Sequence, residues 1–131
     1  MRKLLLLGVL VIGATLGISA MAGARAAIPT TVIFDEAQDT ADPNELNFTG
    51  RVQSPKAKCK NHRKLVISKR PGNSNGGFTR VTTTSTDGTA HWEKVLDTTG
   101  LPDFQVKAPR KTFGRPGHRK TCKSHAILLE A

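Results

Sequence analysis

Two cysteines and two histidines lie at spacings that could support either of two chemistries. Cys59 and His62 are separated by two residues, and His118 and Cys122 by three. Both spacings occur in structural zinc sites. The same sulfurs could instead form a disulfide, and the two possibilities exclude each other. The chain has two bases and an apolar run near its start, the pattern of a secretory signal peptide, and an even cysteine pair in an exported chain favours the disulfide. Its long loop would stabilise the fold by about 4 kcal/mol in the chain-entropy model. We therefore expect a Cys59–Cys122 disulfide and neither a metal nor a cofactor.

His91 and Glu93 could act in acid–base catalysis, because residues two apart share one face of a strand. Small basic nucleases use Glu, His and Arg as acid, base and phosphate clamp. A solvated strand face beside Trp92 is the favoured interpretation. The chain contains no G-x-S-x-G, H-E-x-x-H or P-loop pattern. We expect no enzymatic activity, and a small secreted nuclease using His91 and Glu93 is the alternative.

An acidic run near the start of the chain could hold Ca²⁺ through Asp35, Glu36, Asp39 and Asp42. The run lacks the ligand spacing of an EF-hand and has no acid at its twelfth position. An exposed acidic loop is therefore expected.

Basic residues are segregated into blocks. The chain has 20 Lys and Arg, 10 Asp and Glu, and a net charge of +10. Residues 51–80 and 107–123 contain bases and no acid, and one cysteine lies in each block. A disulfide would bring the blocks together into one basic patch. The candidate anion-binding residues are Lys56, Lys58, Lys60, Arg63, Arg115, Arg119 and Lys120.

Such a patch would attract polyanions. The expected partner is an anionic cell-surface polymer or another extracellular protein. Specific nucleic-acid recognition is not expected, because base stacking needs exposed aromatic residues and most of the Phe and Trp residues occupy predicted core positions. We expect a monomer.

The N-terminal segment has the pattern of a secretory signal peptide. Arg2 and Lys3 precede the apolar run 4–17, and small residues follow up to a cleavage site after Ala22 or Ala26. The apolar run is shorter than a spanning helix requires, and no later stretch is apolar enough to span a membrane. Cleavage after Ala26 removes three of the 20 bases and leaves a net charge of +7. We therefore expect a secreted, extracellular protein.

The remaining chain reads as short strands separated by Gly, Pro, Asn and Asp. The predicted domain organisation is a signal peptide over 1–26, a short strand and acidic loop over 27–45, and a β-sandwich over 46–131. We predict an all-β protein with a single antiparallel sandwich of about seven strands, preceded by the signal-peptide helix. Alternation predicts a core of Leu46, Phe48, Val52, Leu65, Ile67, Val81, Trp92, Phe104, Val106, Ile127 and Leu129.

The order of several short motifs resembles a known family. Gly50-Arg51-Val52 with Ser54-Pro55, then Cys59, the run 63–67, Thr86-Asp87-Gly88 leading to Trp92, and a late Cys122 look like small secreted bacterial proteins with a prealbumin-like, or carboxypeptidase regulatory-like, β-sandwich. The resemblance covers about residues 46–129 and is known largely from actinobacteria. It implies an accessory, adhesive or ligand-binding module without catalytic residues. The immunoglobulin pattern fits less well, because Trp92 lies far beyond Cys59 and the chain has no Tyr.

Overall fold

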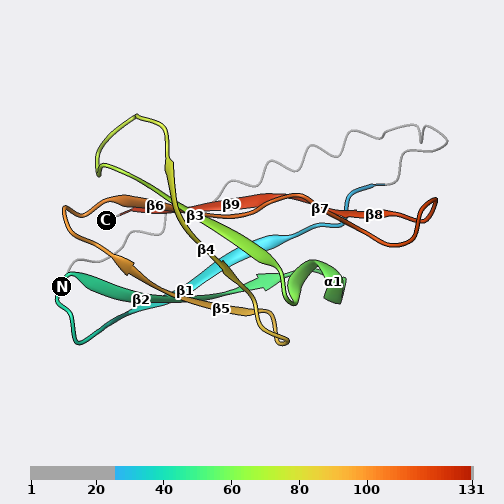
Figure 1. Ribbon diagram of the computed structural model, residues 1–131, viewed down its shortest axis with the longest axis horizontal. Helices are drawn as coiled ribbons and strands as arrows, with labels where there is room; N and C mark the ends of the chain where they lie inside the picture. The colour runs from blue at the N-terminus through green and yellow to red at the C-terminus, as the bar shows by residue number, and fades with distance from the viewer. Residues whose placement is uncertain (1–25, 131) are drawn as a thin grey trace.

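The computed structural model describes residues 26–130, which form nine strands and one short helix (Figure 1). The predicted signal peptide lies outside the described residues, apart from Ala26. No helix in the described part of the chain is long and apolar enough to cross a membrane. The elements are β1 (Thr31–Asp39), β2 (Glu45–Gln53), α1 (Ala57–Lys60), β3 (Lys64–Arg70), β4 (Thr79–Ser85), β5 (His91–Asp97), β6 (Asp103–Ala108), β7 (Lys111–Phe113), β8 (Lys120–Cys122) and β9 (His125–Leu129).

Seven of these strands form two antiparallel sheets. One sheet has the order β1-β2-β5 and the other β4-β3-β6-β9, and their inward side chains form a shared core. The short β7–β8 hairpin projects beyond one end of the sheets, and α1 lies at the same end (Figure 1). The predicted all-β antiparallel fold is confirmed. The hairpin adds two strands to the expected seven, and its basic sequence carries no apolar alternation that would reveal them.

The core follows the predicted alternation closely. Phe48, Val52, Leu65, Ile67, Trp92, Phe104 and Val106 are buried, and Leu46, Ile127 and Leu129 pack against them. Val81 was predicted in the core, but it is 41% exposed. Ile67 pairs with Thr82 and Ser68 pairs with Arg80, so Val81 is the extra residue of a β-bulge. The bulge shifts the alternation of β4 and turns Val81 away from the core.

Strand β1 is longer than the sequence pattern indicates. A short strand followed by an acidic loop was expected over 27–45, but β1 runs from Thr31 to Asp39 and pairs with β2 along its length. Val32 is 2% exposed and belongs to the shared core. Residues 31–39 are therefore part of the sandwich rather than a segment that precedes it.

Candidate functional site

The two cysteines form a disulfide that ties α1 to β8. Their Cα atoms lie 5.5 Å apart, and both residues are completely buried. The predicted disulfide is confirmed. The Cys₂His₂ zinc hypothesis is wrong because the bond uses both sulfurs, while His62 and His118 have exposed side chains.

The disulfide brings the two acid-free blocks of the sequence together. Lys58 lies in α1 beside Cys59, and the Lys111 Nζ donates a hydrogen bond to the Lys58 carbonyl oxygen at 3.2 Å. Lys111 also pairs with Cys122 across the β7–β8 hairpin. Bases that are more than fifty positions apart in sequence thus share one end of the molecule. We call this basic end the disulfide-end surface, comprising Lys56, Lys58, Lys60, Arg110, Lys111, Arg115, Arg119, Lys120 and Lys123.

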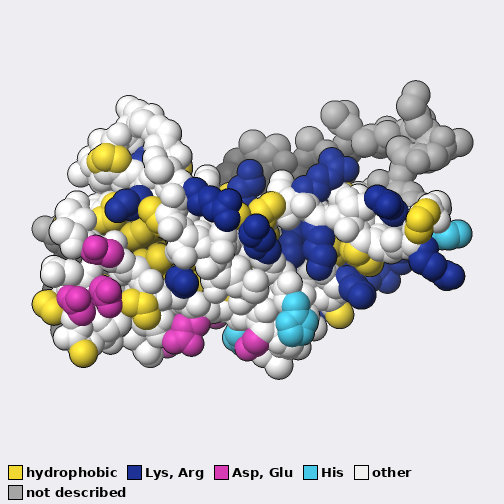
Figure 2. Space-filling view, viewed as in Figure 1, with side chains coloured by type: hydrophobic (Ala, Val, Ile, Leu, Met, Phe, Trp, Pro, Cys, Tyr) yellow, Lys and Arg dark blue, Asp and Glu magenta, His cyan; other side chains and the backbone are white. Residues whose placement is uncertain are grey.

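Six of the seven predicted anion-binding residues belong to this surface. Lys60 is half-buried and the other five are exposed, namely Lys56, Lys58, Arg115, Arg119 and Lys120. Sequence reasoning had not selected Arg110, Lys111 and Lys123, although they lie in the same acid-free block and could have been found from it. Most visible Lys and Arg side chains lie over the centre and the β7–β8 end, and most visible Asp and Glu lie towards the other end (Figure 2).

No carboxylate neutralises the surface within the described residues. The ion pairs recorded there are Arg51–Asp35 and Arg70–Asp103, and neither involves a base of the disulfide-end surface. The acids of the sequence also lie outside both blocks. Its charges are therefore available to an external anion.

Arg63 was predicted on the anion-binding surface, but it is 1% exposed and cannot contact a polymer in solution. Its Nη1 donates to the Cys59 carbonyl and to the Thr30 hydroxyl, and its Nη2 donates to the carbonyls of Pro109 and Lys123. The guanidinium thus satisfies oxygens from four segments that meet behind the disulfide.

Burial lowers the pKa of Arg63 from its ordinary value, although guanidinium groups stay protonated in proteins. The four oxygens that accept from it are neutral, so its positive charge adds to the field of the exposed bases. Arg63 is consequently a buried structural residue that links the segments beneath the disulfide-end surface.

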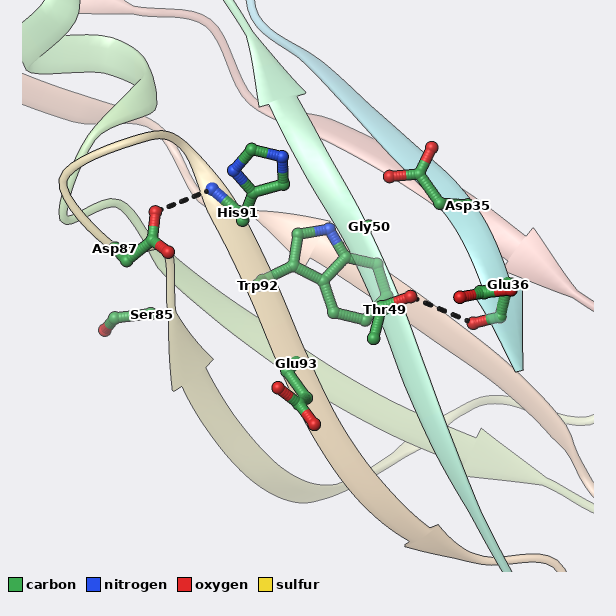
Figure 3. Close-up of a pocket in the computed structure, with 9 residues that line it drawn as sticks. All are labelled: Asp35, Glu36, Thr49, Gly50, Ser85, Asp87, His91, Trp92 and Glu93. Carbon is green, nitrogen blue, oxygen red and sulfur yellow. Dashed lines mark hydrogen bonds between the residues drawn. The ribbon is translucent and has the colours of Figure 1, made fainter. Parts of the chain in front are cut away.

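His91 and Glu93 line a separate hollow of about 550 Å³. Figure 3 shows the hollow along β1, β2 and β5, and its labelled lining includes the imidazole of His91 and the carboxylates of Asp35, Glu36, Asp87 and Glu93. The structure thus places the two candidate catalytic residues together, as the sequence predicts. Four carboxylates, of which Asp35 is paired with Arg51, leave the hollow with a net negative lining, which repels a phosphodiester.

Local hydrogen bonds fix the positions of Asp87 and His91 in this hollow. The Asp87 carboxylate accepts from the Thr89 amide and hydroxyl and from the His91 amide. These hydrogen bonds lower the pKa of Asp87 to about 2, with the His91 amide making the largest contribution. His91 Nδ1 lies 3.0 Å from the Thr89 hydroxyl, which fixes the imidazole over the same turn.

The remaining groups that a nuclease would need are also engaged. Glu93 accepts a hydrogen bond from the Asn47 amide. Arg51, which lies opposite His91 on the neighbouring strand, pairs with Asp35 at 3.1 Å. The described lining of this hollow contains no Lys or Arg, and Lys60, a base outside both recorded ion pairs, lines an adjoining hollow with His91.

The acidic run considered for Ca²⁺ is spread over β1 and the loop that follows. Asp35 holds Arg51, and Asp42 caps its own turn by accepting from the Asn44 amide. Within residues 26–130, no three His, Cys, Asp or Glu side chains are close enough to hold one metal ion.

No protein-family model matches this chain, and it has no match among curated proteins or solved structures. Its function is therefore inferred from its own geometry and charge.

Proposed function

We propose that this chain is a secreted, non-enzymatic β-sandwich protein of the prealbumin-like type, and that its disulfide-end surface binds an anionic cell-surface polymer. One observation carries the proposal: a buried disulfide joins two acid-free segments and gathers their exposed bases at one end of the molecule. Two further features support it. A structural disulfide is typical of exported proteins, and the facing antiparallel sheets agree with the sandwich that the motif order implies.

Binding at this surface would be electrostatic. The bases are exposed or half-buried and lie on a short helix, a hairpin and the adjoining loops, so each contributes a long-range attraction and few shaped contacts. Exposed charge pairs are individually weak, at about 0.2–1 kcal/mol each. A polymer that engages several of them together gains affinity by releasing its counterions. The resulting binding should be multivalent and strongly dependent on salt.

The composition of the surface favours a polymer over a specific nucleic-acid sequence. Phe113 is the aromatic residue of the β7–β8 hairpin, and it is half-buried. Sequence-tolerant binding of single strands relies on exposed aromatic platforms, and sequence-specific readout needs side chains placed against base edges. A cluster of Lys and Arg instead recognises repeated phosphate, sulfate or carboxylate groups.

Retention on immobilised heparin and on anionic cell-wall material tests the proposal. We expect retention at low salt and elution by about 0.5 M NaCl, because salt screens exposed charges. Absence of retention at low salt, or retention that persists above that concentration, would contradict an electrostatic polyanion-binding role.

A further inference from the structure

An apolar groove of about 480 Å³ lies at the end of the sandwich opposite the disulfide. It runs between β1 and β9, the edge strands of the two sheets, and the loop between β5 and β6 closes one side. These edges are joined near the disulfide end, where the Val32 amide donates to the His125 Nδ1 at 2.9 Å. Beyond that hydrogen bond the interior of the sandwich opens to the surface.

Aromatic rings connect the groove to the core. The ring of Phe34 lies 6.0 Å from that of Phe48, which in turn lies 5.7 Å from Phe104. Phe48 and Phe104 are buried, whereas Phe34 is 38% exposed, so the ring series runs from the core out to the groove wall. Apolar side chains at this opening remain in contact with water, and exposed apolar patches mark binding sites.

Leu101 supports a binding role because the fold holds it in an unfavourable conformation. Its φ angle is 51°, in the left-handed region that residues other than glycine rarely adopt. The Leu101 amide donates to the Thr98 carbonyl at 2.9 Å, which fixes the turn. The side chain lines the groove and is 68% exposed, so it gains little from burial in the free protein. Backbone strain occurs more often at binding sites than elsewhere, and Leu101 is the one of four non-glycine residues with positive φ in residues 26–130 that lines this groove.

Two carboxylates lie beside the groove. Glu130 belongs to its lining and also to that of an adjoining polar hollow that contains Arg70. Asp39 shares the inward face of β1 with Ala37, because the two residues are two positions apart, and it pairs with Leu46 of the groove lining. Neither carboxylate takes part in a hydrogen bond or ion pair recorded for residues 26–130. The groove lining contains no Lys or Arg.

We propose that this groove binds a cationic amphiphile, a small molecule with one alkyl chain and an ammonium head. The alkyl chain would lie against Phe34, Ala37 and Leu128, and the head would lie between Asp39 and Glu130. The volume falls within the range of about 300–1,000 Å³ typical of small-molecule sites. A strand from a second copy is disfavoured, because carboxylates along the edge strand β1 oppose edge-to-edge pairing.

Calorimetric titration with two probes of equal chain length tests the proposal. The probes are dodecyltrimethylammonium and the neutral dodecyl maltoside, both below their micellar concentrations. We expect the cationic probe to bind about fivefold more tightly, as exposed carboxylate–ammonium pairs allow. The double variant Asp39→Asn/Glu130→Gln should remove this preference and leave the affinity for the neutral probe unchanged. Equal affinities in the unaltered protein would overturn the proposal.

A groove-filling variant with a matched control locates the site. Ala37→Trp places an indole in the groove, and Gln38→Trp places the same group on the opposite face of β1. We expect Ala37→Trp to weaken binding of the cationic probe by about tenfold through lost apolar contact, and Gln38→Trp to leave it unchanged. If Ala37→Trp does not fold, Leu101→Ser replaces it and should also weaken binding.

Equal weakening by both Trp variants, or by neither, would overturn the assignment to the groove. Sedimentation equilibrium of the unaltered protein tests whether a second copy of the chain occupies the groove instead. A concentration-dependent dimer that Ala37→Trp abolishes would show that the groove receives a second copy and would also overturn the proposal.

Discussion

Gly50 and Trp92 lie opposite each other on β2 and β5, and the indole ring fills the space that a side chain at Gly50 would need. A Cβ atom there would lie 2.5 Å from Cε2 and Cζ2 of the ring and would also collide with the Ile33 carbonyl oxygen. Trp92 is 2% exposed, so its ring cannot move aside into solvent. The absence of a side chain at Gly50 is what lets the largest core residue fit between the sheets.

Gly50→Ala should therefore destabilise the protein by about 1–3 kcal/mol, as overpacking of a core does. Urea unfolding followed by Trp92 fluorescence measures the change. Gly77→Ala is the matched control, because a Cβ at Gly77 would meet nothing within 4 Å. Equal stability of the two variants would show that the Gly50–Trp92 contact is not tight in solution.

Removal of the disulfide should cost about 4 kcal/mol in the chain-entropy model, since the bond closes a loop with a sequence separation of 63. The variant Cys59→Ser/Cys122→Ser measures this by urea unfolding beside the oxidised protein. The reduced unaltered chain should match the double variant. A loss below about 1 kcal/mol would indicate that the bond constrains the unfolded chain far less than the model requires.

Arg63→Met should destabilise the protein by about 3 kcal/mol or more, because buried carbonyl oxygens that lose their donors keep their desolvation cost. Lys64→Met, at the exposed neighbouring position, is the control and should have little effect. Thermal unfolding of both variants measures the difference. If Arg63→Met were as stable as Lys64→Met, the four hydrogen bonds of the Arg63 guanidinium would contribute little to the fold.

Asp87 should make the stability of the protein depend on acid pH. Its pKa is lowered from 3.8 to about 2, so its carboxylate favours the folded state above pH 3.8 and loses that effect as the pH falls to about 2. Asp87→Asn should therefore be less stable than the unaltered protein near neutral pH. The difference should shrink towards about pH 2.

Urea midpoints across this pH range provide the measurement for Asp87. Asp39→Asn is a suitable control, because the Asp39 carboxylate accepts no hydrogen bond recorded within the described chain. A difference between Asp87→Asn and the unaltered protein that stayed constant with pH would show that the Asp87 carboxylate charge is not what stabilises the turn.

Alternation along the strands predicted most of the fold. Leu65 and Ile67 are buried as expected, and the same period places Arg63 on their inward face, where the structure has it. The charge of Arg63 favoured a surface position, whereas its place in the strand alternation favoured the interior. The alternation was correct. A buried Arg was not anticipated because its acceptors come from segments distant in sequence, which no local pattern brings together.

Other features depend on pairing that a single sequence does not reveal. The bulge at Val81 follows from the register between β3 and β4. Strand β8 is basic and three residues long, and it is held by β7, by the disulfide and by the bridge between Ile28 and Cys122. The gathering of the two basic blocks was predictable from the cysteine pair. The apolar groove was not predictable, because it depends on the spacing between the edge strands β1 and β9.

The central claim is that the position of the bases matters for polyanion binding, and not the net charge alone. Two double variants with the same charge change separate these possibilities. Lys58→Glu/Arg119→Glu alters the disulfide-end surface. Lys69→Glu/Arg80→Glu alters one Lys and one Arg that are also exposed but lie at the far end of β3 and on β4.

Isothermal titration of both variants with heparin at low salt is the most direct measurement. We expect Lys58→Glu/Arg119→Glu to weaken binding by about tenfold or more, and Lys69→Glu/Arg80→Glu to weaken it by about twofold through net charge alone. Equal weakening by the two variants would contradict a polyanion-binding site at the disulfide end.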